Sequence, residues 1–306
     1  MLPLRIMLEY FHPWPNSAGF YLARERGWYA DAGLDVELCV PDPERGDSLQ
    51  HLLDGAVQLS VFPSNRLLVR RDQGQPLKGV AAINHDGLEA FQTLREFAIQ
   101  RPRDLMGKRL AMNPTPRGLA MVRDLVRQDG GDPDAVIIVD AGARELRPEE
   151  LAAGVADASF GGYWAWEALM DSPVAAERRV VHRVSRWGAP AYHSYLLGAR
   201  EDWIDANPQV LRAFLAATAR GFESVAAEPQ RARHAYERVI PYFPGALIEQ
   251  SLAHIAPTWL HEGRFGQQRQ ALLEPYANWL HQHGILQRPD AWANATTNAY
   301  LPGEAR

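Results

Sequence analysis

One short segment in the middle of the chain combines the residue types that recognise a flat, hydrogen-bonding ring. Residues 163–167 read Tyr-Trp-Ala-Trp-Glu and follow a Gly-Gly pair. Aromatic side chains stack on heterocycles, and a carboxylate accepts hydrogen bonds from an exocyclic amine or a protonated ring nitrogen. Toward a neutral ring nitrogen, Glu167 would have to be protonated. The segment predicts contact with an amino-substituted heteroaromatic; the alternative is a helix-start acid with tryptophans in the core.

Three other turns lie where α/β sheets bind ligands, between a strand and the helix that follows it. They are the proline-rich loop 11–17, residues 62–65 and residues 113–118. In the third turn, backbone N–H groups at the helix start suit an anionic group, with Arg117 as its partner. The alternatives are that the polar residues of these turns cap helices and that Arg117 is solvated.

These turns depend on an alternation of short apolar strands with amphipathic helices. In the first block, strands are expected at 5–10, 35–40, 57–62 and 77–84, and helices at 19–32, 47–54 and 65–73. In the second block, strands are expected at 109–112, 135–139, 158–161 and 179–184, and helices at 117–128, 147–153 and 163–170. Helices then follow at 208–227, 230–239, 245–254 and 267–281. The alternation predicts mostly parallel sheets flanked by helices, with a helical C-terminal tail.

Two α/β blocks followed by a helical tail predict two lobes. We expect residues 1–86 and 190–306 to form lobe 1 and residues 88–186 to form lobe 2, with a ligand cleft between them. The chain would cross between lobes at 84–89 and 185–192. In the second crossing, Trp187 and Tyr192 either clamp a ring or serve interlobe packing.

Composition narrows the function classes. The chain has 306 residues, of which 46% are apolar and 23% are charged, with a net charge of −5. This balance gives no electrostatic reason to expect nucleic-acid binding. No stretch is long and apolar enough to suggest a membrane span, and Cys39 is the only cysteine, which excludes an internal disulfide and a cysteine zinc site. We expect no metal and no cofactor.

Five segments, taken in order, resemble the nitrate/taurine-type substrate-binding proteins of ABC importers. They lie at 9–36, 74–83, 104–108, 161–167 and 279–285. The opening segment most resembles the branch that binds pyrimidine precursors of thiamine. The resemblance implies an α/β, two-lobed periplasmic-binding-protein fold of type II, each lobe a mixed sheet flanked by helices, that closes around a small molecule by hinge motion.

The resemblance also implies that Glu167 contacts a pyrimidine and that loop 11–17 contacts the ligand. Two residues depart from the family's pattern, Ser17 where a histidine is expected and Ala165 where an asparagine is expected. The residues and the resemblance together give the expected ligand-binding side chains: Trp14, Asn16, Ser17, Phe62, Ser64, Asn113, Thr115, Arg117, Tyr163, Trp164, Trp166, Glu167, Trp187 and Tyr192.

The function implied is a monomeric solute-binding protein that passes a thiamine-type aminopyrimidine to a membrane permease. Within binding proteins, the alternatives are a sulfonate or a riboflavin-like ring. From another class, the alternatives are a cytosolic ligand sensor and a thiamine-pyrimidine biosynthesis enzyme, because the fungal pyrimidine synthase has a similar fold. That synthase joins pyridoxal phosphate to a lysine and sacrifices a histidine, positions that fall near Phe62 and Arg66 here. The cysteine cluster of that synthase is missing from this chain, in which Cys39 is the only cysteine.

The first residues show no basic segment followed by an apolar stretch. We therefore expect either a cytoplasmic protein, or a periplasmic or membrane-anchored extracytoplasmic one whose leader has been removed.

Replacing Glu167 by glutamine tests the pyrimidine reading. Glu167→Gln keeps the side chain's size but exchanges one acceptor oxygen for a donor amide, and a mismatched buried pair costs about 1–3 kcal/mol. Affinity for an aminopyrimidine should fall at least about tenfold, as measured by titration calorimetry, while the fold is retained. Unchanged affinity would leave Glu167 as a solvated helix-start acid.

Overall fold

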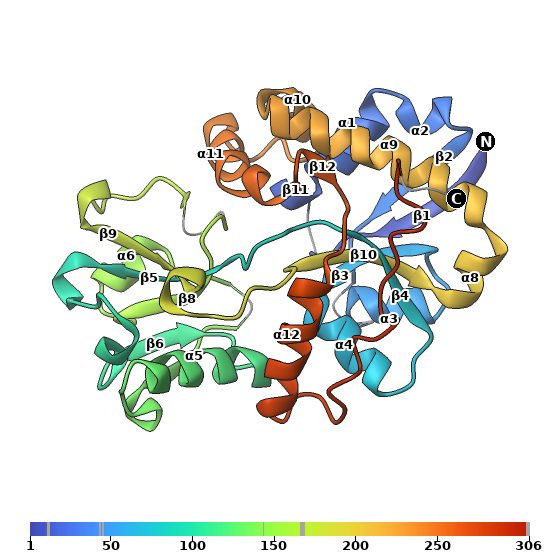
Figure 1. Cartoon of the computed structure of the whole chain (residues 1–306). Helices are drawn as coiled ribbons and strands as arrows, with labels where there is room; N and C mark the ends of the chain where they lie inside the picture. Colours follow the sequence, from blue (N-terminus) through green and yellow to red (C-terminus); the bar gives the residue numbers. More distant parts are fainter. Residues whose placement is uncertain (11–12, 43, 45, 143, 166–168, 304–306) are drawn as a thin grey trace. The chain divides into compact units, whose positions relative to one another are not determined.

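The computed structural model describes residues 1–10, 13–42, 44, 46–142, 144–165 and 169–303. These form two compact units (Figure 1). Unit 1 comprises Met1–Asp86 and Tyr192–Arg306, and unit 2 comprises Gly87–Ala191. The boundaries expected from the sequence, at residues 86 and 190, lie beside these divisions, although unit 2 runs on to Ala191 rather than ending at 186.

Unit 1 is built on a mixed five-stranded sheet in the order β2-β1-β3-β10-β4. The strands are β1 (Leu2–Met7), β2 (Leu34–Cys39), β3 (Leu59–Pro63), β4 (Leu77–Ala82) and β10 (Tyr195–Arg200). The first strand pairs in parallel with β2 and β3, whereas β10 is antiparallel to β3 and β4. The carboxyl ends of β1, β3 and β4 and the start of β10 therefore share one edge of the sheet.

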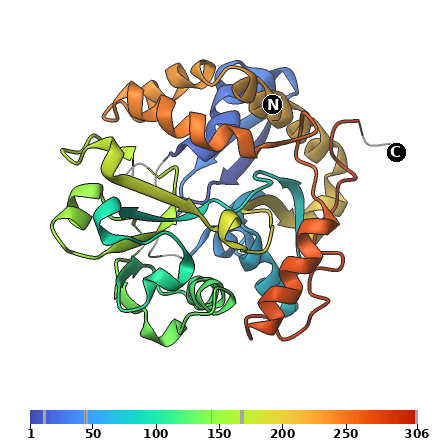
Figure 2. The ribbon, with the colours of Figure 1, turned by 60° about the vertical axis from the view of Figure 1, so that its left-hand side comes forward.

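Helices cover both faces of this sheet (Figures 1 and 2). They are α1 (Ala18–Glu25), α2 (Trp28–Asp31), α3 (Ser48–Leu53), α4 (Ser64–Asp72), α8 (Glu201–Ala206), α9 (Pro208–Ala227), α10 (Gln230–Val239), α11 (Gly245–Ile255) and α12 (Gln270–Gln282). A short hairpin, β11 (Leu260–His261) and β12 (Arg264–Phe265), precedes α12. The helix expected at 19–32 is divided into α1 and α2, because Gly27 adopts a left-handed φ of 73°.

The first helix is held against α9 by a close backbone approach. A Cβ on Gly221 would lie 2.2 Å from the carbonyl oxygen of Gly19, and a Cβ on Gly19 would meet the Phe222 ring. Only glycine at both positions lets the two helices approach this closely. Because α1 begins directly after the loop that carries Trp14 and Asn16, this contact fixes where that loop ends.

Unit 2 has a second mixed sheet, in the order β7-β6-β8-β5-β9. Its strands are β5 (Glu89–Leu94), β6 (Arg109–Met112), β7 (Ile137–Asp140), β8 (Ala158–Gly162) and β9 (Arg179–Arg183). Its helices are α5 (Pro116–Gln128) and α6 (Pro148–Ala152). The strand β5 is antiparallel to β8 and β9, so the start of β5 lies at the same edge as the ends of β6 and β8. An apolar core of buried side chains fills the interior, including Leu94, Ala111 and Leu151.

Two strands, β5 and β10, lie outside the ranges expected from the sequence. Each directly follows a passage of the chain from one unit to the other. The expectation that a helix begins at Tyr163 is wrong, because Tyr163 and Trp164 lie in a turn after β8. Gly161 and Gly162, the pair before them, are the last two residues of β8, and the turn begins after Gly162.

Candidate functional site

The carboxyl edge of the unit 1 sheet gathers a set of buried polar side chains. Glu9 follows β1, Ser64 follows β3, and Asn84 follows β4. Tyr195 opens the antiparallel strand β10 at the same edge. Strand ends in an open α/β sheet leave space for a ligand because the backbone turns away there. These residues form the candidate site of unit 1.

Glu9 uses one carboxylate oxygen and leaves the other free. Its Oε1 accepts hydrogen bonds from Trp14 Nε1 and, at 3.3 Å, from Asn16 Nδ2. Its Oε2 is buried and has no hydrogen-bond partner among the described residues. Burial raises the pKa of Glu9 from its usual 4.5 to about 7, because the ionised form loses hydration. A buried acceptor without a protein partner costs stability, so a donor from water or from a ligand stabilises it.

Asn16 holds the loop that carries Trp14 in place. Its Oδ1 accepts from Asn84 Nδ2 at 2.9 Å and from Trp259 Nε1 at 2.9 Å, and its Nδ2 donates to Asn84 Oδ1 at 3.1 Å. Asn84 Nδ2 also donates to Thr258 Oγ1 at 2.8 Å. The side-chain amide of Asn16 is fully buried and its acceptor is occupied twice. Asn16 is thus fixed by Asn84 and Trp259, and its Nδ2 helps to orient the Glu9 carboxylate.

A group of aromatic rings centred on Trp14 lies beside this carboxylate. The Trp14 indole stacks on Tyr10, with centroids 4.8 Å apart, and meets the edge of Tyr195 at 5.7 Å. The Tyr236 hydroxyl donates to the backbone oxygen of Trp14. The indole is 6% exposed, so its position is set by packing as well as by its bond to Glu9. A carboxylate beside stacked rings has the chemistry predicted for the other unit from residues 163–167.

Two serine hydroxyls lie at the same edge. Ser17 and Ser64 are buried, and neither Oγ has a hydrogen-bond partner among the described residues. Neither hydroxyl caps its helix, which excludes the ordinary alternative considered for them. The backbone of Ser64 is fixed by a 3.1 Å bond from its N–H to the Ser194 oxygen.

In unit 2, the corresponding edge holds charged groups that are paired. Arg117 is buried and donates to Glu89 Oε1. The N–H of Gly162 donates to Glu145 Oε1 at 2.7 Å. A Cβ on Gly161 would lie 2.5 Å from Glu145 Oε1, so the first glycine of the pair is required by the approach of this carboxylate.

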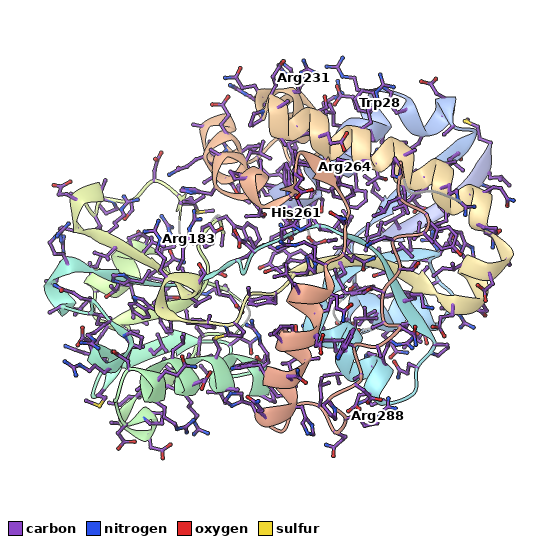
Figure 3. All side chains as sticks on the ribbon, viewed as in Figure 1. Trp28, Arg183, Arg231, His261, Arg264 and Arg288 are labelled. Carbon is purple, nitrogen blue, oxygen red and sulfur yellow. The ribbon has the colours of Figure 1, made fainter. Side chains whose placement is uncertain are left out.

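The aromatic segment of unit 2 is described as far as residue 165. The Arg183 guanidinium lies over the Tyr163 ring, 4.0 Å from its centroid, and Arg183 is labelled in Figure 3. Trp164 is buried beside Gly162. Trp166 and Glu167, on which the sequence prediction placed most weight, lie outside the described residues.

The other expected site residues lie in varied surroundings. Asn113 and Thr115 are exposed at the start of α5, where the Thr115 hydroxyl accepts from the Gly118 N–H as a helix cap. Phe62 is fully buried in the core of unit 1 beside Leu67 and Leu196. Its side chain offers no surface to a ligand, so we leave it out of the candidate site.

The two rings expected to form a clamp belong to different units. Trp187 stacks on Phe91 and His182 in unit 2, with centroids 4.9 and 4.7 Å apart. Tyr192 stacks on Tyr276 of α12 in unit 1, at 4.5 Å. Each ring packs within its own unit, so their joint action on a ligand stays a prediction.

Several residues of these edges were not expected from the sequence as site residues. Glu9 lies two residues after β1 in unit 1, and Glu89 is the first residue of β5 in unit 2. An acid that closely follows a strand is a sequence signal that could identify Glu9. Asn84 and Trp259 gave no local signal, because their importance comes from their bonds to Asn16.

The described part of the chain contains neither a metal-ligand cluster nor a membrane-spanning helix. No group of three or more His, Cys, Asp or Glu side chains there is arranged to hold a metal ion. None of the helices described has both the length and the apolar character needed to cross a bilayer.

Comparison with known proteins places the chain in a family. The NMT1/THI5 like family matches residues 14–232. The chain belongs to this family. The formylaminopyrimidine-binding protein of Halalkalibacterium halodurans is 26% identical over 305 residues, covering 96% of this chain and 90% of that protein. The 4-amino-5-hydroxymethyl-2-methylpyrimidine phosphate synthase of Aspergillus parasiticus is 23% identical over 243 residues, covering 76% and 70%.

The fold has counterparts among solved structures. The periplasmic aliphatic sulphonate binding protein SsuA of Escherichia coli superposes with a TM-score of 0.72 at 14% identity, covering 94% of this chain and 95% of that one. At this identity the likeness concerns the fold alone. The expected resemblance and the α/β periplasmic-binding-protein fold, with two mixed sheets and C-terminal helices, are confirmed.

The unusual protonation of Glu9 predicts a pH-dependent effect of Glu9→Gln on stability. The folded-state pKa lies above the unfolded value, so the folded protein binds more protons between pH 4.5 and about 7 and loses stability as pH rises through that window. The glutamine keeps an acceptor for Trp14 and Asn16 but carries no charge. In the ligand-free state, Glu9→Gln should therefore be more stable than the original chain at pH 8, by roughly 1–3 kcal/mol.

The measurement is urea unfolding of both proteins at pH 4.5, 6 and 8. The buried histidines are common to both, so their titration cancels from the difference. The advantage of Glu9→Gln should shrink toward zero at pH 4.5. A difference that stays constant with pH would show that Glu9 is solvated in the folded state.

Proposed function

We propose that this chain is the solute-binding protein of an ABC importer and that its ligand is a small heteroaromatic with an exocyclic amine, of the thiamine-precursor aminopyrimidine type. The observation that carries the proposal is the free, buried Oε2 of Glu9 beside Trp14. An aromatic amine supplies the missing donor, and its ring supplies a face for the nearby indole and phenol rings. Capture between the two units and delivery to a membrane permease belong to the same proposal.

The family supports this choice of ligand. One relative over nearly the full chain is named for binding a formylaminopyrimidine, and other relatives are named for making an aminopyrimidine phosphate. Both names describe a pyrimidine with an amino substituent. A sulfonate has no donor to offer Glu9, so a buried carboxylate is a poor partner for it. The site therefore favours the aminopyrimidine over the sulfonate alternative.

The enzyme alternative is less well supported by the chain's residues. The position expected for a synthase lysine falls near Phe62, which carries no amine and is buried in the core. Cys39 is the sole cysteine of the sequence. We infer a binding role, with the covalent chemistry of the synthases absent. The periplasmic location expected for an importer's binding protein is part of this inference.

Only one oxygen of Glu9 is available, so Glu9 makes one contact with the ligand. The amine donates to Oε2, and this contact favours the ionised carboxylate. Binding below pH 7 must then release a proton from Glu9, because the free protein holds that proton. Ser17 and Ser64 offer further hydroxyls at the same edge to the ring or its substituents. In the other unit, Glu167, Tyr163 and Trp164 stay proposed contacts.

Calorimetry with a formylaminopyrimidine tests the proposal. The original chain should bind more tightly at pH 8 than at pH 6, because protonation of Glu9 removes the acceptor. Glu9→Gln should lose at least about tenfold in affinity at pH 8, since it presents an amide donor to the ligand's amine. In Glu9→Gln the dependence on pH should be much weaker.

Glu262→Gln is the matched control, because Glu262 is an exposed acid of the same unit. It should bind as the original chain does. Equal affinity of Glu9→Gln and Glu262→Gln would contradict the proposal. An alkanesulfonate and riboflavin should give no comparable heat; tight binding of either would favour the corresponding alternative.

A further inference from the structure

The N-terminal end of α12 lacks the usual cap. Its N-cap residue, Arg269, makes no side-chain cap bond. The N–H groups of Leu272 and Leu273 donate to the Arg269 carbonyl oxygen, which leaves those of Gln270 and Ala271 without an acceptor inside the helix. The backbone N–H of Arg269 donates to His193 Nε2 at 3.0 Å. The other ring nitrogen, Nδ1, lies 3.0 Å from the Asn84 oxygen. His193 is thus fully used in joining the helix start to the end of β4.

A second histidine faces this helix end with no partner of its own. His85 is 8% exposed, and neither of its ring nitrogens has a hydrogen-bond partner among the described residues. Its ring centroid lies 5.1 Å from that of His193 and 5.5 Å from that of His261. Its backbone N–H donates to the Thr258 oxygen at 2.7 Å, which holds the backbone of His85 in place.

Arg269 is a charged neighbour of His85. Burial lowers the pKa of His85 to about 3, with smaller contributions from His193, Arg269 and His261, so the His85 ring is neutral near pH 7. The Arg269 Nε is buried and also has no hydrogen-bond partner among the described residues. No salt bridge from Arg269 is found within the described part of the chain. Figure 3 labels His261, on the β11–β12 hairpin of the same unit.

We propose that His85, Arg269 and the first turn of α12 form a binding site for an oxyanion. An oxyanion accepts from a ring N–H of His85, from the Nε–H of Arg269 and from the N–H groups of Gln270 and Ala271 at the helix start. The positive end of the helix dipole favours the same charge. A water molecule would fill the hydrogen bonds but would leave the charge of the Arg269 guanidinium without a counter-ion.

The site is linked to the edge that holds Glu9. His85 directly follows Asn84, whose amide bonds to Asn16, and Asn16 in turn bonds to Glu9. The oxyanion is therefore either a charged substituent of a bound heteroaromatic or a free inorganic anion. The proposal goes beyond the proposed function and stands without it, because the anion site does not involve Glu9 or Trp14.

The site is tested by measuring how the full chain binds inorganic phosphate and sulfate. The measurements are titration calorimetry and the shift of the thermal unfolding temperature. Arg269→Gln should weaken this binding at least tenfold, and His85→Asn should weaken it as well. Arg264→Gln is the matched control: it makes the same charge change at an exposed residue of β12, labelled in Figure 3, and should bind as the original chain does. Circular dichroism checks that each variant folds. If Arg269→Gln does not fold, His85→Asn provides the test in its place.

An aminopyrimidine alcohol and its phosphate monoester distinguish the two sources. If the anion is a ligand substituent, the monoester should bind at least tenfold more tightly than the alcohol, and Arg269→Gln should abolish that difference. If it is a free anion, phosphate should bind without displacing the alcohol. Binding of phosphate with no binding of either pyrimidine would contradict the proposed function alone. Absence of saturable anion binding, or equal losses in Arg269→Gln and Arg264→Gln, would overturn the anion site.

Discussion

A carboxylate that is buried with one oxygen unpaired is the constraint on which the candidate site depends. Leaving Glu9 Oε2 without a partner costs free energy that the fold must offset elsewhere. The offset comes from the contacts that hold the loop: the paired amides of Asn16 and Asn84 and the indole N–H groups of Trp14 and Trp259. The close approach of α1 and α9 at Gly19 and Gly221 fixes the helix into which this loop leads. A preorganised acceptor of this kind binds a donor without having to move.

Both units repeat one design at the edge of a mixed sheet. In each unit, an acid lies at that edge and a helix begins there: Glu9 with α1 in unit 1, and Glu89, which pairs with Arg117 of α5, in unit 2. In unit 1 the acid has a free oxygen, whereas in unit 2 Glu145 bonds to Gly162 and Glu89 bonds to Arg117. This difference gives unit 1 the clearer demand for a ligand donor.

Most of the fold could be predicted from the sequence because local signals agreed with the tertiary structure. Alternation of buried and exposed residues marks β2, and Pro116 with Thr115 marks the start of α5. The strands β5 and β10 escaped because neither belongs to the alternation of strands and helices: each directly follows a passage of the chain between units and runs antiparallel to its neighbours. Tyr163 was expected in a helix because the aromatic spacing suits one. In the structure it lies in a turn, with its ring against Arg183.

The site was harder to predict than the fold, for a physical reason. The chemistry of acids and aromatics can be found in a single segment, and residues 163–167 were chosen on that basis. The importance of Glu9 arises from burial and from partners such as Asn84 and Trp259, which are distant in the sequence. Burial and the absence of a partner are properties of the folded chain, so no local pattern reports them.

The most direct test of the account is a crystal structure of the chain with a formylaminopyrimidine bound. The account predicts that the amine nitrogen of the ligand lies about 2.7–3.2 Å from Glu9 Oε2, with the Trp14 and Asn16 bonds to Oε1 retained. A complex in which the ligand's amine is held elsewhere, while a protein group or water satisfies Glu9 Oε2, would contradict it.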